Sequence, residues 1–98
     1  MIRADEIARR GDYAGAWESA ELAFREFPDD AKLNQLRATL TTKAANFVES
    51  LSRARELEER DQLGSSLAWY LRAQRFYPPS QFAREGVERL VEKILPGA

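Results

Sequence analysis

The chain of 98 residues is long enough for one small domain, and its 15 Lys and Arg against 16 Asp and Glu leave a net charge of −1. This balance offers no basic patch, so we expect no nucleic-acid partner. Cysteine and histidine are both absent, which removes thiolate and imidazole metal ligands and the commonest general base. We therefore expect a protein that is not an enzyme, with no catalytic residue, no metal site and no cofactor.

No apolar run approaches the roughly 18 residues that a membrane span needs, so we expect no membrane insertion by this segment. The opening MIRADEIARRGD contains no hydrophobic signal core. A chain without cysteine is compatible with the cytoplasm and with the periplasm, so its localisation stays open. The first residues already have a helical pattern without a cap, and the chain stops at ILPGA. We therefore expect residues 1–98 to be a single domain cut from a longer bacterial protein.

Two helices are expected at the start of the chain. The first covers residues 2–10 and is broken by Gly11-Asp12, because glycine tolerates the left-handed helix end and Asp12 can cap the next helix. The second covers about 13–27 and ends at Pro28. Its apolar side chains share one face at spacings of three and four, namely Tyr13, Ala16, Trp17, Ala20, Ala23, Phe24 and Phe27.

Residues 31–60 contain neither proline nor glycine, and their apolar side chains continue one stripe. The stripe consists of Leu33, Leu36, Leu40, Ala44, Phe47, Leu51, Ala54 and Leu57. The simplest interpretation is one helix of close to thirty residues, about 45 Å long. The alternative is two helices, with a break near Thr41-Thr42 or Asn46. Such a stripe must be buried against other helices or against a second copy.

The next helix begins at the polar turn Asp61-Gln62 and ends at Pro78-Pro79. One of its sides carries Leu63, Leu67, Tyr70, Leu71, Gln74 and Tyr77, with Ser66 and Ala73 as small positions. Ser80 can cap a last helix over 81–95, whose stripe is Phe82, Ala83, Val87, Leu90, Val91, Ile94 and Leu95. Gly86 costs about 1 kcal/mol inside this helix. We interpret it as a position of close packing.

Residues 11–31 and 61–81 repeat one layout at an offset of fifty residues. The aligned pairs are Ala23 with Ala73, Arg25 with Arg75, Phe27 with Tyr77, and Pro28 with Pro78. The order of turn, small residue, aromatic residue and proline resembles the tetratricopeptide repeat, a helix–turn–helix unit. The second stretch carries Ser66, Tyr70, Ala73 and Pro78, and the first carries Gly11-Asp12-Tyr13, Ala16, Ala20, Ala23 and Pro28, with alanine at 20 in place of the aromatic residue. The family period is 34 residues, so the extra residues here fall in 31–46.

The resemblance implies an all-α fold of antiparallel helix pairs, a tetratricopeptide-like α-α superhelix with one long central helix and a C-terminal capping helix over 81–95. A generic helical bundle is the alternative. The resemblance also implies a protein-interaction or scaffolding module that binds a peptide or partner protein in a larger assembly. Its groove would be lined by Asp5, Arg9, Leu51, Arg55, Glu58, Glu85 and Arg89.

Three further features have competing interpretations. Trp17 lies on an apolar face and is expected in the core, whereas Trp69 lies off the main stripe and is either packed between helices or an interface anchor. The acidic run Glu56, Glu58, Glu59 and Asp61 is interpreted as a charged helix end rather than a metal or acid–base site. As an alternative function, the long central helix would drive self-association as a homodimer or a helix-exchanged oligomer.

Overall fold

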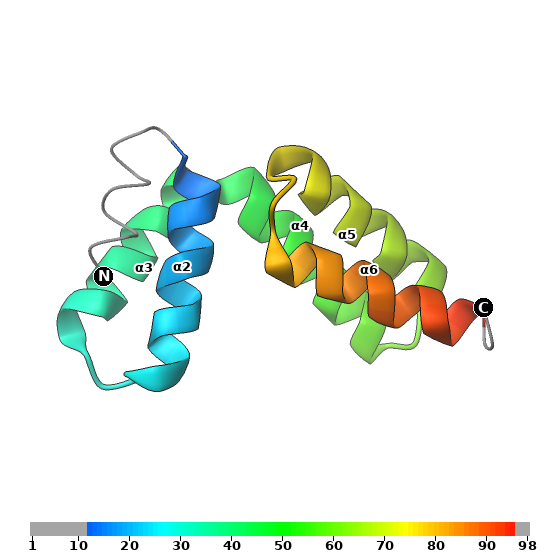
Figure 1. Ribbon diagram of the computed structural model, residues 1–98, viewed down its shortest axis with the longest axis horizontal. Helices are drawn as coiled ribbons and strands as arrows, with labels where there is room; N and C mark the ends of the chain where they lie inside the picture. Colours follow the sequence, from blue (N-terminus) through cyan, green and yellow to red (C-terminus); the bar gives the residue numbers. More distant parts are fainter. Residues whose placement is uncertain (1–11, 96–98) are drawn as a thin grey trace. The chain divides into compact units, whose positions relative to one another are not determined.

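The computed structural model describes residues 12–95, which form helices and no strand within that range (Figure 1). In order, the helices are α2 (Tyr13–Glu26), α3 (Ala31–Lys43), α4 (Ala45–Glu59), α5 (Leu63–Phe76) and α6 (Gln81–Ile94). The all-α class is confirmed for this part of the chain, while the helix expected over 2–10 lies outside the described residues. The chain divides into two compact units between Ala45 and Asn46.

The central segment forms two helices, so the prediction of one long helix over 31–60 is wrong and the two-helix alternative holds. Ala44 separates α3 from α4, with φ −109° and ψ 35°. Near the end of α3, the hydroxyls of Thr39 and Thr41 donate to backbone carbonyls four residues earlier, at 3.1 and 2.8 Å. Hydroxyls that bond back in this way weaken and bend a helix. The absence of proline and glycine was therefore not sufficient for a continuous helix.

The apolar stripe of this segment is nevertheless buried by the chain itself. Its buried members are Leu33, Leu40, Ala44, Phe47, Leu51 and Ala54. These side chains belong to the hydrophobic core, which supplies most of the stability of short helices. The central segment therefore leaves no continuous apolar stripe uncovered for a second copy.

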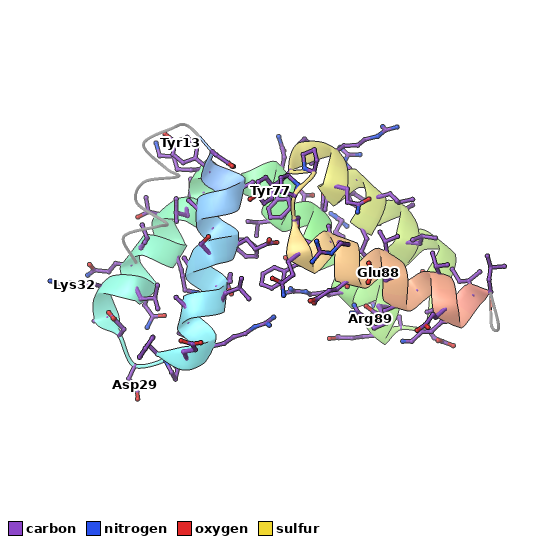
Figure 2. All side chains as sticks on the ribbon, in the orientation of Figure 1. Tyr13, Asp29, Lys32, Tyr77, Glu88 and Arg89 are labelled. Carbon is purple, nitrogen blue, oxygen red and sulfur yellow. The ribbon has the colours of Figure 1, made fainter. Side chains whose placement is uncertain are left out.

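The hairpins α2–α3 and α5–α6 turn in the same way, fifty residues apart. Each first helix is followed by an aromatic C-cap residue, Phe27 or Tyr77, whose N–H donates to the carbonyl four residues earlier at 3.0 Å. Figure 2 shows Tyr77 at the start of the second turn. After the turn, the side chains of Asp30 and Ser80 cap α3 and α6, each accepting from the N–H three residues later at 3.0 Å. The repeated layout expected from the sequence is thus present in both hairpins.

In the first unit, α2 and α3 are joined by aromatic and charged side chains. Trp17 is buried, as its place on the apolar face predicts, and its Nε1–H donates to the Thr41 hydroxyl at 3.1 Å. Arg37 of α3 makes two parallel hydrogen bonds to the carboxylate of Glu21 of α2, at 2.8 and 3.1 Å. Its guanidinium also lies 3.7 Å from the centre of the Phe24 ring. The first hairpin is therefore closed by contacts between its own two helices.

In the second unit, α5 and α6 are in close contact at Tyr70 and Gly86. A Cβ atom at Gly86 would lie 2.5 Å from ring atoms of Tyr70. Tyr70 is only 1% exposed, so its ring has no free space to move into. The interpretation of Gly86 as a close-packing position is confirmed.

Helix α4 completes the second unit by packing on this hairpin. The Ser66 hydroxyl of α5 donates to the backbone carbonyl of Ala54 of α4 at 2.6 Å, in a buried position. The rings of Phe47 and Tyr77 meet edge to face, with their centres 5.8 Å apart. Asp61 forms the corner between α4 and α5 in the left-handed region, at φ 62°. This corner sets the direction in which α5 returns along α4.

Candidate functional site

A polar cluster around Glu58 of α4 joins the three helices of the second unit. Arg89 of α6 donates from Nε and Nη2 to the two carboxylate oxygens of Glu58, at 2.6 and 2.8 Å. The Tyr70 hydroxyl of α5 donates to the same carboxylate at 2.9 Å, and Arg89 donates to the Tyr70 oxygen at 3.1 Å. Lys93 of α6 adds a longer contact at 3.4 Å. One carboxylate thereby binds side chains from both neighbouring helices.

The cluster keeps its members in their ordinary charge states. The hydrogen bond from Arg89 is the largest cause that lowers the pKa of Glu58 from 4.5 to about 2, and it outweighs the opposing effect of burial. Burial, and then the hydrogen bond to Glu58, raise the pKa of the Tyr70 hydroxyl. The hydrogen bond to Glu58 raises the pKa of the Arg89 guanidinium. Near neutral pH the Glu58 carboxylate therefore stays ionised and paired with the Arg89 guanidinium, which does not suit this pair to general acid or base chemistry.

Trp69 of α5 is half-buried and lies beside residues of α4. The guanidinium carbons of Arg53 and Arg72 lie 5.5 and 5.2 Å from the centre of its ring. A hollow of about 280 Å³ beside it is lined by Arg53, Glu56, Leu57, Arg60, Ser65 and Trp69. Two of these arginines pair with exposed glutamates one helical turn away, at 3.2 and 2.9 Å. Exposed pairs of this kind contribute little to stability.

The predicted groove residues have different surroundings in the structure. Glu58 and Arg89 come together, but as an ion pair with each other. Leu51 is buried in the core of the second unit, so its side chain offers no surface to a partner. That prediction failed because the stripe of α4 to which Leu51 belongs faces the core.

Two other predicted groove residues remain at the surface. Arg55 is exposed, and its guanidinium lies 5.2 Å from the centre of the Phe82 ring of α6. Glu85 is exposed and accepts a hydrogen bond from the side-chain amide of Gln81 at 2.9 Å. Arg9 lies outside the described residues.

The sequence analysis assigned Tyr70 no polar role. Tyr70 lies four residues after Ser66, and this spacing puts both side chains on one face of α5. That spacing is the signal that could have indicated a contact between Tyr70 and α4.

The acidic run at the end of α4 does not converge on one point. Glu56 pairs with Arg60 at 2.9 Å, whereas Glu58 is occupied by Arg89. Within residues 12–95 no three carboxylates gather as metal ligands. In the same range, no helix has both the length and the apolar character needed to cross a bilayer.

Comparison with known proteins gives no match. No family model, curated protein or solved structure matches this chain.

Proposed function

We propose that this chain is a protein-interaction module of the tetratricopeptide type, which binds a peptide or partner protein within a larger assembly. The equivalent turns and caps of the two hairpins support this proposal, because repeated helix pairs are the building units of such modules. Exposed side chains that the core does not require supply the binding surface.

The observation that carries the proposal is the surface around Trp69. An indole ring at a surface offers a large, rigid apolar contact, and tryptophan is enriched among residues that dominate binding energy. The guanidinium groups of Arg53 and Arg72 approach the ring, and Arg60 lines the hollow beside it. Guanidinium groups favour carboxylates. The partner that fits is a segment with an apolar residue for the indole and acidic residues for the arginines.

The predicted groove residues Arg55 and Glu85 belong to the same proposal. Both lie on the side of the second unit where α4 and α6 are joined by the Glu58 cluster, and both are exposed. Arg55 lies roughly 160° around α4 from Arg53, so the charges of Arg55 and Glu85 form a surface separate from the one around Trp69. Arg55 and Glu85 are therefore proposed as secondary contacts, weaker than Trp69 because they are solvated.

Selection from a random peptide library tests this function. The immobilised chain is expected to enrich peptides with an apolar residue next to Asp or Glu, and Trp69→Ala is expected to weaken their binding roughly tenfold or more. Phe27→Ala is the matched control, because Phe27 is an exposed aromatic residue of the first unit. Circular dichroism checks that both variants fold. Enriched peptides that bind the Trp69→Ala variant as tightly as the unchanged chain would refute the assignment.

A further inference from the structure

The surface around Trp69 continues along α5 to a second exposed ring. Phe76 lies seven residues after Trp69, roughly 20° around the helix and about 10.5 Å farther along its axis. Phe76 is 44% exposed. Arg72 lies between them in the sequence, and its guanidinium carbon is 5.2 Å from the centre of the Trp69 ring and 5.9 Å from that of Phe76. Because one guanidinium contacts both rings, the three side chains form a continuous surface, which we call the α5 stripe.

Arg72 puts a positive charge at the centre of the α5 stripe. Among residues 12–95, no carboxylate lies within ion-pair distance of it. Arg53, which approaches Trp69 from α4, is by contrast paired with Glu49 at 3.2 Å. A guanidinium beside an aromatic ring retains N–H groups in its own plane, and these bind a carboxylate through two parallel hydrogen bonds. The charge of Arg72 therefore favours an acidic group on the segment that covers the stripe.

The helices that carry this surface offer side chains and no open backbone edge. The hollow beside Trp69 is lined by residues of both α4 and α5. Within α-helices the backbone N–H and C=O groups bond to each other, so an extended peptide would not find the backbone partners that a sheet edge provides. A helical partner satisfies its own backbone groups and makes its contacts through side chains. A helix is therefore the conformation that fits this surface.

The spacing of the α5 stripe defines the matching face of such a helix. Residues seven positions apart on a helix lie about 10.5 Å apart along its axis and on the same face. The residue three or four positions after the first lies between them on that face. Two apolar residues at this spacing would meet the rings of Trp69 and Phe76, and an Asp or Glu between them would meet Arg72.

We propose that the α5 stripe binds an amphipathic, acidic helix of a partner protein. The binding face of that helix has apolar residues seven positions apart and a carboxylate three or four positions after the first. This inference rests on the proposed function and specifies the conformation and the spacing of the partner segment. Phe76 is then a second apolar anchor in addition to Trp69, and Arg72 is the residue that selects acidic segments.

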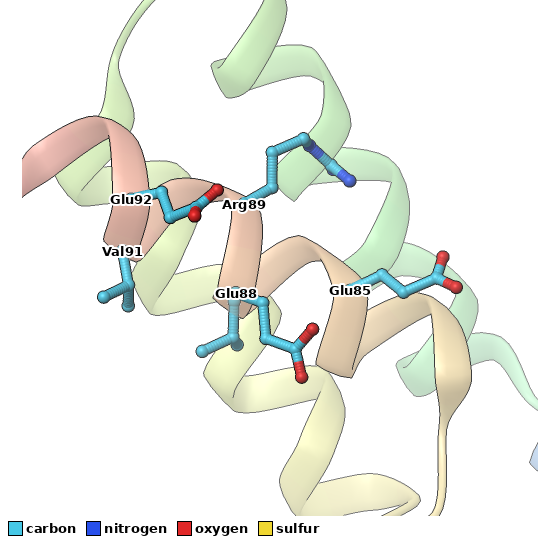
Figure 3. A pocket seen from close by; sticks show the side chains of 6 residues that line it. Glu85, Glu88, Arg89, Val91 and Glu92 are labelled. Carbon is cyan, nitrogen blue, oxygen red and sulfur yellow. The ribbon is translucent and has the colours of Figure 1, made fainter. Parts of the chain in front are cut away.

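A hollow on α6 of the same unit differs in charge. Its lining includes Glu85, Glu88 and Glu92 (Figure 3). Arg89 also lines this hollow, but its guanidinium is paired with Glu58 of α4. The three carboxylates would repel an acidic segment, so we do not expect the partner helix to bind there. The signs of the charges thus distinguish the α5 stripe as the site.

A synthetic helical probe tests the proposal. The probe is an alanine–glutamine peptide of about 18 residues, with leucines seven positions apart and a glutamate between them, and fluorescence anisotropy of the labelled peptide measures its binding. Phe76→Ala is expected to weaken binding roughly tenfold or more. Leu71→Ala is the matched control and is expected to leave binding unchanged. Leu71 is 45% exposed on the same helix but lies roughly 160° around it from Trp69.

Two altered probes test the conformation of the partner. In one, the leucines are five positions apart and therefore lie on different sides of the helix. In the other, a proline away from the binding face breaks the helix and leaves the leucines and the glutamate in place. Both are expected to bind roughly tenfold more weakly or less. A proline probe that binds as tightly as the original would identify an extended peptide as the occupant and overturn the proposal.

A charge exchange tests the role of Arg72. Arg72→Glu is expected to weaken binding of the glutamate probe roughly tenfold or more, and to bind instead a probe with lysine in place of the glutamate. Arg75→Glu is the matched control, since Arg75 is an exposed arginine of α5 that lies roughly 120° around the helix from Trp69. It is expected to retain the preference for the glutamate probe. Circular dichroism verifies that every variant is folded.

Failure of this inference and failure of the proposed function are separate outcomes. Library peptides that need Trp69 but tolerate Phe76→Ala would support the proposed function and overturn the helical partner. The inference is also overturned if the original probe does not bind at millimolar concentration, or if Arg72→Glu keeps the preference for glutamate. A library that yields no peptide dependent on Trp69 would refute the proposed function and this inference together.

Discussion

The two hairpins have a large and a small residue at equivalent positions of their two helices, but in opposite order. In α5–α6, Tyr70 packs against Gly86 so closely that a Cβ atom would not fit. Fifty residues earlier the sequence has Ala20 on the first helix and Leu36 on the second. The same turn is therefore compatible with a large residue on the first helix and a small one on the second, or with the reverse. Only the α5–α6 hairpin has the large residue on its first helix, and the hydroxyl of that residue, Tyr70, reaches the third helix α4.

This difference decides how each unit is closed. The Tyr70 hydroxyl brings α5 into the Glu58 cluster, which spans three helices. In the first unit, Arg37 and Glu21 instead join two helices directly. The hairpin with the small residue on its first helix therefore has an ion pair between two helices, and the hairpin with the large residue there has a polar cluster between three helices.

Each unit also contains one tryptophan, Trp17 or Trp69, so fluorescence of single-tryptophan variants reports on each unit separately.

The largest expected effect comes from Tyr70→Ala. Removing this buried ring is expected to cost about 3 to 5 kcal/mol in the second unit, because a cavity forms beside Gly86. The double variant Tyr70→Ala/Gly86→Leu copies the sizes found at Ala20 and Leu36, and is expected to regain about 1 to 2 kcal/mol. Urea unfolding followed through Trp69 measures both changes. A double variant no more stable than Tyr70→Ala would show that the two hairpins do not share this contact.

The second effect concerns the close approach at Gly86. Gly86→Ala is expected to destabilise the second unit by about 1 to 3 kcal/mol, because the added Cβ overlaps the Tyr70 ring. Gly64→Ala is the matched control, since a Cβ there meets nothing within 4 Å. It is expected to stabilise α5 by up to about 1 kcal/mol. Thermal unfolding of both variants should therefore move in opposite directions, and equal shifts would contradict the packing described.

The third effect is a dependence of stability on pH. The pKa of Glu58 is lower in the folded chain, so its contribution is fully present above pH 4.5 and is lost as the pH falls from 4.5 toward about 2. Because Arg89 is 45% exposed, we expect a contribution of only about 1 to 2 kcal/mol. Glu58→Gln should remove this contribution at neutral pH and flatten the acid limb of unfolding reported by Trp69. Unfolding reported by Trp17 serves as the control.

The fourth effect compares an ion pair between two helices of the first unit with an exposed pair within one helix of the second unit. Arg37→Ala is expected to cost about 1 kcal/mol, because it removes a bidentate pair with Glu21 and the contact with the Phe24 ring. Arg60→Ala removes an exposed pair one helical turn from its partner and is expected to cost about 0.3 to 0.5 kcal/mol. Urea unfolding followed through Trp17 measures the first change. A cost for Arg37→Ala no greater than that for Arg60→Ala would show that the interhelical pair adds nothing.

Local signals in the sequence predicted most helix ends. The expected helices over 13–27 and 81–95 differ by one residue from Tyr13–Glu26 and Gln81–Ile94, because proline and a capping side chain act within a few residues of the helix ends they define. The simplest interpretation of residues 31–60 contained no break, whereas the alternative placed one near Thr41-Thr42 or Asn46, on either side of the observed break at Ala44. No proline or glycine marks it, and the back-bonding of Thr39 and Thr41 becomes visible only when side-chain rotamers are known.

The candidate site was predicted only in part. Glu58 and Arg89 were selected separately as groove residues, but they lie on different helices and 31 positions apart. Periodicity assigns residues to a face of one helix and does not determine which faces of two helices meet. The partnership with Tyr70 and the burial of Leu51 depend on that meeting, so both required the three-dimensional arrangement.

The turns at Phe27–Asp30 and Tyr77–Ser80 have a consequence for design. Each turn satisfies its polar groups locally, through one carbonyl before it and one capping side chain at its end. These hydrogen bonds involve only residues of the turn and of the helix ends beside it. A corner of this kind can be transplanted between helix pairs as a standard connector, while the faces of the joined helices are rewritten for new contacts.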